Sequence, residues 1–251
     1  MQEIFSRVEL LFDKEGLQRI QSRRIILFGV GGVGSWCAES LVRTGITNLT
    51  IVDFDDVNPS NINRQLMATT RTIGMPKVEA LRERLLEINP NAHITAICEV
   101  YSEATNHLFN LSQYHYIIDC IDSLKDKMTL LHHATATPAK VFSSMGAALK
   151  VDPTQIKVAE LWKVRGCPLG AALRKKMKQK HILPAQKVMC VYSEELLQNK
   201  GQKGPSEIEE NSPIKKVQTN GSLSHITGIF GFTIAGMIIH DIVMDEEAAD
   251  N

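Results

Sequence analysis

A chain of 251 residues has the length of one large domain or two small ones. Its content of 43% hydrophobic and 22% charged residues is typical of a soluble globular protein and excludes a disordered or fibrous one. The 28 basic residues balance 28 acidic ones, so the overall charge indicates no class of partner.

The charges are distributed unevenly along the chain. Residues 150–216 carry 14 basic and 7 acidic side chains, whereas residues 217–251 carry no basic and 5 acidic side chains. The densest basic part is "RKKMKQKH" at 174–181. Two interpretations stay open for this surplus, which are the solvated face of a helix and a patch that contacts the phosphates of a nucleic acid.

The cysteines are widely spaced and form no C-x-x-C pair, at Cys37, Cys98, Cys120, Cys167 and Cys190. This spacing indicates neither a structural zinc site nor a disulfide framework, so we expect a reducing, cytoplasmic location. The N-terminus lacks the apolar segment of a signal peptide. The apolar stretch 226–240 is shorter than a membrane span of about 20 residues and predicts a buried helix, with a membrane anchor as the alternative.

The first half of the chain alternates strand and helix patterns. An apolar run at 23–30 enters the glycine-rich turn "GVGGVG" (29–34), and a helical pattern at 35–45 ends at a glycine that can cap it. The apolar segment 48–54 predicts a second strand. Strand, glycine turn, helix and strand together form the first unit of a Rossmann-like sheet.

The alternation continues and then weakens. We expect a helix at 76–90, strands at 93–100, 114–122 and 139–146, and a helix at 123–137. The second half predicts strands at 152–162 and 186–193, a basic helix at 168–180, a mobile loop rich in glycine, proline and charge at 196–213, and a long helix at 222–242. The predicted fold is α/β: a mostly parallel Rossmann-like sheet with flanking helices, extended by extra strands and a C-terminal helix.

The turn matches the G-x-G-x-x-G pattern at Gly29, Gly31 and Gly34. Glycine lets the backbone approach a phosphate, and the helix that follows supplies N–H donors. A tight turn without a ligand is the alternative. Asp53 ends the second strand at the place where a carboxylate holds ribose hydroxyls. The first 55 residues therefore favour a dinucleotide such as NAD and an oxidoreductase.

Three later residues do not fit this interpretation. Arg64 lies in "SNINRQ" (60–65), Lys77 opens a helix, and Asp122 ends the fourth strand. Ligands gather at the carboxyl ends of parallel strands, so these residues should converge with Asp53, although each alone could be an ordinary surface charge. Two cations and a spare carboxylate suit a triphosphate with magnesium, for which Asp122 is the candidate ligand. The hypothesis is attack of a substrate carboxylate on the α-phosphate of ATP, which gives an acyl-adenylate.

The motif series "GVGGVGS…LVRTGITNLTIVDFDDVNPSNINRQ…GMPKVE…IDCIDS" resembles the adenylating domain of the ubiquitin-activating-enzyme-like superfamily over residues 5–150. The resemblance implies an ATP-binding half at 1–150 and a substrate-side half at 151–251, within a single domain that spans 1–251. It implies that Arg64 and Lys77 hold the phosphates, that Asp122 holds magnesium, and that Arg7 reaches across a homodimer into the partner's site. The implied ATP site comprises Gly29, Gly31, Gly32, Gly34, Asp53, Asp55, Asn61, Arg64, Gln65, Lys77, Asp122 and Ser123.

Within the superfamily, "SRVELLFDKEGLQRI", "DPTQIKVAEL" and "CVYSEE" are similar to the branch of tRNA-modifying dehydratases. That branch implies ATP-dependent activation of the threonyl carboxylate of threonylcarbamoyladenosine beside the tRNA anticodon. Intramolecular cyclisation then releases AMP, with net loss of water. The basic segment 163–187 is then a candidate tRNA contact.

The alternative is adenylation of the C-terminus of a ubiquitin-like sulfur-carrier protein. The activators of such carriers often carry paired C-x-x-C zinc ligands, which this sequence lacks. Some relatives also carry a cysteine shortly before the last helix, whereas "KKVQTNGSLS" (215–224) has none. A sulfur-transfer partner is therefore disfavoured, and Cys190 is interpreted as a buried structural thiol.

Overall fold

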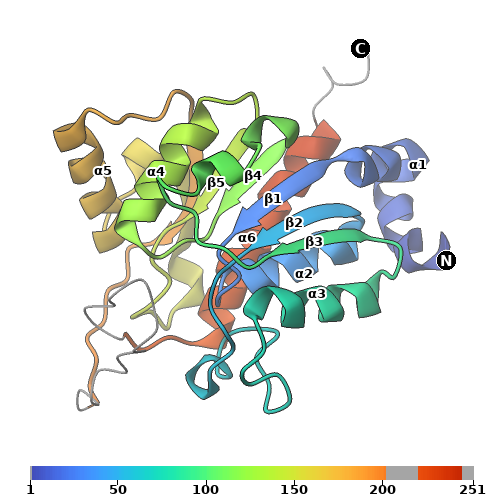
Figure 1. The fold of residues 1–251 in the computed structure, drawn as a ribbon, viewed down its shortest axis with the longest axis horizontal. Coiled ribbons are helices and arrows are strands. Elements are labelled where there is room, and N and C mark those ends of the chain that lie inside the picture. The colour runs from blue at the N-terminus through green and yellow to red at the C-terminus, as the bar shows by residue number, and fades with distance from the viewer. Residues whose placement is uncertain (1, 202–219, 245–251) are drawn as a thin grey trace.

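Seven strands form one sheet in the order β3-β2-β1-β4-β5-β7-β6 (Figure 1). The computed structural model describes residues 2–201 and 220–244. All neighbouring strands are parallel except β6 and β7, which are antiparallel. The predicted α/β fold is thus confirmed. The strands are β1 (Arg24–Phe28), β2 (Asn48–Val52), β3 (His93–Ile97), β4 (Tyr116–Asp119), β5 (Lys140–Ser144), β6 (Ile156–Glu160) and β7 (Val188–Ser193).

The helices from α2 onward agree with the sequence patterns, whereas the first helix, α1, was not predicted. Gly45 closes α2 in the left-handed conformation, with φ of 116°. The strand predicted at 152–162 was too long. Only β6 is extended, because Pro153 and the Asp152 side chain, which accepts a hydrogen bond from the Thr154 N–H, begin a 3-10 turn before it. The α-helices are α1 (Ser6–Ser22), α2 (Gly34–Thr44), α3 (Lys77–Ile88), α4 (Leu124–Thr135), α5 (Pro168–Lys180) and α6 (Ser224–Met244).

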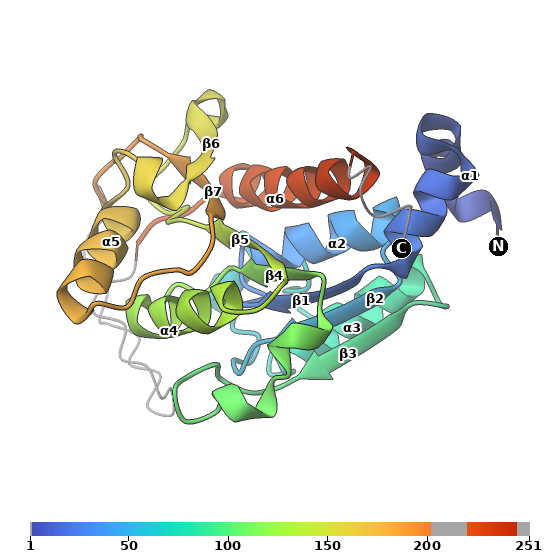
Figure 2. The ribbon, with the colours of Figure 1, turned by 90° about the horizontal axis from the view of Figure 1, so that it is seen from above.

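Helices cover both faces of the sheet, and Figure 2 shows α2 and α6 on one side and α4 on the other. Alternate residues of β1 serve the two layers, since Ile25 and Leu27 pack in one core cluster and Ile26 and Phe28 in the other. This alternation of buried residues on both faces explains why the strands read as continuous apolar runs.

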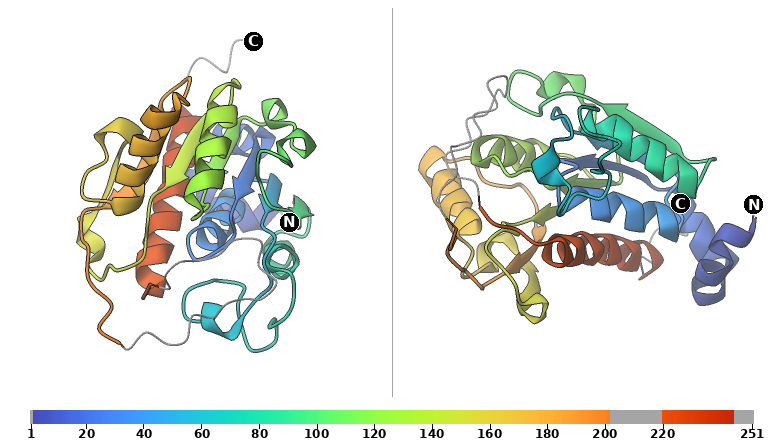
Figure 3. Two further views of the ribbon diagram at one scale, coloured as in Figure 1. Left: turned by 60° about the vertical axis from the view of Figure 1, so that its left-hand side comes forward. Right: turned by 90° about the horizontal axis from the view of Figure 1, so that it is seen from below.

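The last helix, α6, lies along α2 (Figures 2 and 3). A Cβ at Gly231 would lie 2.5 Å from the carbonyl oxygen of Val33, so glycine is required for this close approach. The long helix predicted at 222–242 corresponds to α6, which has 21 residues and is long and apolar enough to cross a membrane by length and composition. Its Ile234 and Ile238 side chains are fully buried, and it packs as a core helix.

The predicted mobile loop 196–213 falls mostly outside the described residues. Strand order reverses between β1 and β4, from which the sheet continues in opposite directions. We call the side of the sheet where the parallel strands end the carboxyl edge, and the side where they begin the amino edge. A crevice at the carboxyl edge of such a reversal is the usual ligand position in open α/β sheets.

Candidate functional site at the carboxyl edge

The glycine turn follows β1 at the strand-order reversal, and two of its glycines are required by packing within the chain. Gly29 has a φ of 85°, and a Cβ there would lie 2.7 Å from the carbonyl oxygen of Cys120, in the loop after β4. A Cβ at Gly34 would lie 1.9 Å from the Gly29 oxygen. Gly29 thus lets the turn pack against the loop after β4, and Gly34 lets the turn close on itself.

Gly31 differs, because a Cβ there would meet only the Gln65 side-chain nitrogen, at 3.8 Å. Nothing in the chain requires glycine at this position, whereas close approach of a phosphate to the backbone does. The Gln65 side chain is buried, and its Oε1 has no hydrogen-bond partner among the described residues. A Cβ at the neighbouring Gly32 would lie 3.4 Å from Cγ of Arg64. The turn and the "SNINRQ" segment therefore lie against each other, and an unsatisfied polar atom lies beside the turn, which fits a bound nucleotide.

Asp53, directly after β2, is tied to the glycine turn. One carboxylate oxygen accepts the Val30 N–H at 2.8 Å, and the other accepts the Asp55 N–H at 3.0 Å. Burial raises the pKa of the Asp53 carboxyl above its ordinary value, although the nearby Lys77 opposes this. Asp53, the predicted ribose-binding residue, therefore also links the end of β2 to the glycine turn through a hydrogen bond.

The "SNINRQ" segment begins in a short 3-10 turn, Pro59–Asn61, labelled η2. The side chain of Asn61 is buried and accepts the Asn58 N–H at 3.0 Å, so it holds the loop rather than facing an open site. The carbonyl of Arg64 accepts a hydrogen bond from Nε1 of Trp36 at 3.0 Å. The arginine backbone is therefore fixed against α2.

The guanidinium of Arg64 donates to the Ser60 carbonyl and to the Asn63 side chain, both at 2.9 Å. Burial lowers the pKa of Arg64, and the carboxylate of Asp122 opposes this shift. That electrostatic coupling shows that the predicted phosphate-binding cation and the predicted metal ligand lie near each other. The two loops that carry them, after β2 and after β4, meet at the carboxyl edge as the sequence predicted.

Lys77 begins α3 with a buried side chain. Its Nζ lies 2.6 Å from a carboxylate oxygen of Asp55, whose side chain is 22% exposed. Its backbone N–H also donates to the Asp55 carbonyl at 2.9 Å. Lys77 is therefore positioned by Asp55 and close enough to Asp53 to influence its pKa.

The sequence placed Asp122 at the end of the fourth strand, but β4 ends at Asp119 and Asp122 lies in the loop that follows. Asp122 is exposed, whereas Asp119 is fully buried and forms an ion pair with Lys127 of α4 at 2.7 Å. Asp119 accepts the Ile121 N–H at 3.1 Å, and Lys127 donates to the Ile121 carbonyl at 3.0 Å. The ion pair thus binds both the N–H and the carbonyl of Ile121, the residue before Asp122. Ser123 serves as the N-cap of α4.

Sequence reasoning missed this buried pair and the contribution of α6. Thr227 of α6 lies against the turn, since a Cβ at Gly32 would be 3.1 Å from its Cγ2. The only sequence signals were a lysine inside a helical pattern and a threonine in an apolar one. The lysine pattern does not identify Asp119, 8 positions before Lys127, and the threonine pattern does not identify Gly32, 195 positions before Thr227.

No group of three or more His, Cys, Asp or Glu side chains that could hold a metal occurs within 2–201 and 220–244. Magnesium is usually held by one or two carboxylates together with substrate phosphates, so a single exposed Asp122 beside the phosphate space fits that cation. Cys190 is fully buried in β7, and burial raises its pKa above the ordinary value, as expected for a structural thiol.

Two predicted functional segments lie away from the glycine turn. Arg7 is exposed on α1, which leads directly into β1 and therefore lies at the amino edge of its own chain. The helix α5 starts near the carboxyl edge, where Leu169 approaches Gly146, and leads to the start of β7 at the amino edge. The densest charges of the basic segment 163–187, at 174–181, thus lie toward the amino edge rather than beside the turn.

Comparison with known proteins decides the family. A model of the ThiF family matches residues 5–251. This chain belongs to the ThiF family. A ThiF-family relative from Bacillus subtilis (strain 168), a tRNA threonylcarbamoyladenosine dehydratase, is 32% identical over 243 residues, which cover 97% of this chain and 96% of the relative. The protein of that name from Escherichia coli (strain K12) is 35% identical over 198 residues, which cover 77% of this chain and 74% of the relative.

The structural comparison agrees with the sequence comparison. The crystal structure of the E. coli tRNA N6-threonylcarbamoyladenosine dehydratase in complex with ATP superposes with a TM-score of 0.85 at 30% identity, covering 100% of this chain and 97% of that one. The likeness to this ThiF-family enzyme therefore includes the second half of the chain, beyond the part shared by all Rossmann-like folds.

Proposed function

We propose that this protein is an ATP-dependent tRNA dehydratase that cyclises N6-threonylcarbamoyladenosine next to the anticodon. The observation that carries the proposal is that the glycine turn at Gly31 lies against Gln65, whose buried oxygen has no partner among the described residues, while the neighbouring Arg64 lies near Asp122. The tRNA substrate is inferred from the dehydratases to which the chain is similar along nearly its whole length.

The chemistry requires activation of a carboxylate. An oxygen of the threonyl carboxylate attacks the α-phosphorus of ATP, and pyrophosphate leaves. The backbone at Gly31 admits the phosphates, and the side chains of Arg64 and Lys77 stabilise the negative charge that develops on them. Asp122 would hold magnesium, which when bound would neutralise charge on the departing pyrophosphate. A nucleophilic atom of the same modification then attacks the acyl carbon, loses its proton and expels AMP, so the enzyme needs no covalent nucleophile.

A further proposal follows from the position of α1, and two others concern location and tRNA contact. Arg7 lies at the amino edge of its own chain, so its role in an ATP site requires a second copy. We therefore propose a homodimer in which Arg7 completes the partner's site. We also propose a cytoplasmic location, where the tRNA substrate is found. The basic segment 163–187 is proposed to contact tRNA phosphates, and no sulfur-transfer partner is required by this chemistry.

The decisive test is nucleoside mass spectrometry after incubation of the protein with ATP, magnesium and tRNA that bears the open modification. We expect the modified nucleoside to lose the mass of one water while AMP forms. An unchanged mass without AMP would overturn the proposal. Pyrophosphate exchange that depends on a Gly-Gly-tailed carrier protein instead of tRNA would favour the sulfur-carrier alternative.

Variants test the site within the same assay. Arg64→Ala and Asp122→Ala should each reduce AMP formation at least about 100-fold, since each removes a charge that acts on the phosphates. Arg71→Ala is the matched control, because Arg71 is exposed in the same loop and has no proposed role. Full activity of either site variant, with an unchanged circular dichroism spectrum, would show that the site is wrongly assigned.

A further inference from the structure

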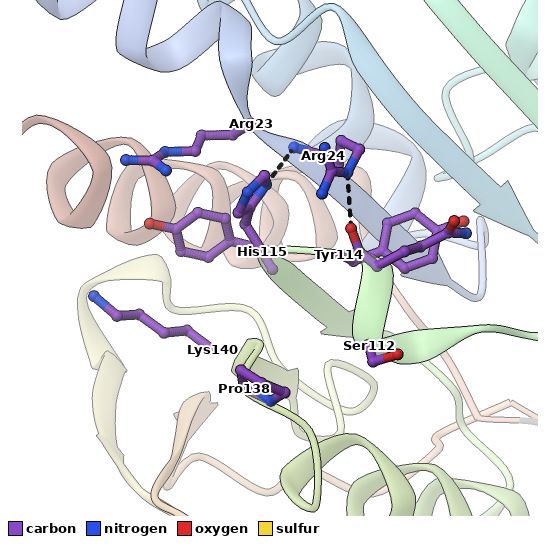
Figure 4. Close-up of a pocket in the computed structure, with 9 residues that line it drawn as sticks. Arg23, Arg24, Ser112, Tyr114, His115, Pro138 and Lys140 are labelled. Atoms are coloured by element: carbon purple, nitrogen blue, oxygen red, sulfur yellow. Dashed lines mark hydrogen bonds between the residues drawn. The ribbon is translucent and has the colours of Figure 1, made fainter. Parts of the chain in front are cut away.

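A second pocket opens at the amino edge, on the opposite side of the sheet from the glycine turn. Its volume is about 280 Å³, and it lies where β1, β4 and β5 begin. Four of its lining residues are basic, namely Arg23, Arg24, His115 and Lys140, and Figure 4 shows them around the opening. Among its described lining residues none is acidic.

Hydrogen bonds fix two of these groups and leave donors available. The Arg24 N–H donates to Nδ1 of His115 at 2.9 Å, so the other ring nitrogen, Nε2, carries the imidazole proton. The Arg24 side chain is steadied by donation from its Nε to the Gln113 carbonyl at 2.7 Å. Nε of Arg23 is buried and has no partner among the described residues. A buried N–H donor of a cation without an acceptor is costly, which suits a site that an anion completes.

Among the described residues, the side chains that line the pocket carry a net positive charge. Asp241 of α6 lies beside it and pairs with Lys140 at 2.9 Å, while it also accepts the hydroxyl proton of Tyr116 at 2.6 Å. This carboxylate compensates the lysine, and the charges of Arg23 and Arg24 have no such counterpart among the pocket's described residues. Burial lowers the pKa of His115, and the nearby charges of Arg24 and Arg23 lower it further.

We propose that this pocket is a second phosphate-binding site, separate from the ATP site. Two guanidinium groups and an imidazole N–H suit the several acceptor oxygens of a phosphate, because arginine can present paired donors to such a group. The site does not depend on the proposed adenylation chemistry, since its residues lie at the other edge of the sheet. The ligand's source is either a free phosphate or the backbone phosphate of an RNA.

A second observation favours an RNA backbone as the source of the phosphate. The basic end of α5 points toward the same edge, and Lys178 lies with its Nζ 5.5 Å from the centre of the Trp162 ring there. A phosphate held between β1 and β4 and further phosphates along α5 would follow one nucleic-acid backbone. We therefore expect RNA to be the stronger ligand.

The experiment is calorimetric titration of inorganic phosphate into the full-length protein saturated with a non-hydrolysable ATP analogue, which keeps phosphate out of the carboxyl edge. Wild-type protein should bind phosphate, and Arg23→Gln and Arg24→Gln should each weaken this binding at least fivefold. Arg82→Gln is the matched control, because Arg82 lies on α3 and pairs with Glu79 away from the pocket. Two pocket variants are used because the partly buried Arg23 also ends α1, whereas Arg24 is exposed.

The second arm measures tRNA affinity by fluorescence anisotropy at several salt concentrations. If a tRNA phosphate occupies the pocket, Arg24→Gln should weaken binding and reduce the salt slope by about 1. Weaker phosphate binding with unchanged tRNA binding would support the site and assign it to a free anion. Equal phosphate affinity in wild type, both pocket variants and the control, or no phosphate binding at all, would overturn the proposal.

Discussion

Two lysine–aspartate pairs flank the candidate site, with nearly equal N–O distances and different surroundings. Lys77 and Asp55 lie 2.6 Å apart with 6% and 22% of their side chains exposed, whereas Lys127 and Asp119 lie 2.7 Å apart and are both fully buried. The buried aspartate has further partners, because it also accepts the Ser143 hydroxyl at 2.6 Å. In a partly solvent-exposed ion pair, the lysine can exchange its aspartate for a phosphate. A fully buried ion pair has only a structural role.

The largest effect should come from breaking the fully buried pair of Lys127 and Asp119. Lys127→Met leaves the Asp119 carboxylate buried without its counter-charge, so we expect a loss of about 3–5 kcal/mol in the free energy of unfolding. Urea denaturation followed by circular dichroism measures it. The double variant Lys127→Met/Asp119→Asn removes both charges and should recover part of the loss. A single variant that loses less than about 1 kcal/mol would contradict the assigned structural role.

The open pair should give a change in activity instead of stability. Lys77→Met removes the cation that we propose stabilises the ATP phosphates, so AMP formation should fall at least about 100-fold. The free energy of unfolding should change by only about 1 kcal/mol, because Asp55 remains partly hydrated. Steady-state AMP assays and urea denaturation on one preparation measure both. A variant with normal turnover and strongly reduced stability would reverse the contrast between the pairs.

A third ionic group should give the smallest effect: the buried carboxylate of Glu39 on α2 contacts the more exposed guanidinium groups of Arg43 on α2 and Arg84 on α3. Burial alone would raise the pKa of Glu39, but the guanidinium groups of Arg84 and Arg43 outweigh it and hold the pKa below its ordinary value. This stabilisation is present above the unfolded-state pKa of about 4.3 and is lost as pH falls through the lower folded-state pKa. Glu39→Gln should cost about 1 kcal/mol at pH 7. Denaturant unfolding from pH 7 to pH 3 should show that the difference in unfolding free energy between wild type and Glu39→Gln decreases. A difference that does not change with pH would exclude an ionic origin.

The contrast between the pairs also marks what the sequence could predict. Gly29, Gly34 and Asp53 were predictable because a glycine pattern and a strand-end carboxylate are local signals with one physical meaning. Lys77 and Arg64 were placed at the carboxyl edge by topology alone. The roles of Asp119 and Lys127 were not predictable, because a charged residue inside an amphipathic helix pattern gives no sign that it is fully buried. The contact of Thr227 with the turn depends on α6 returning across the sheet, which no local pattern encodes.

The chain contains two tryptophans, and the fold assigns one to each region described above. Trp36 donates its indole N–H to the Arg64 carbonyl, and Trp162 lies under Lys178 at the basic end of α5. Each indole is thus a natural fluorophore beside one proposed ligand, the first beside ATP and the second beside RNA. The emission of single-tryptophan variants can therefore follow the two binding events independently, without an attached dye.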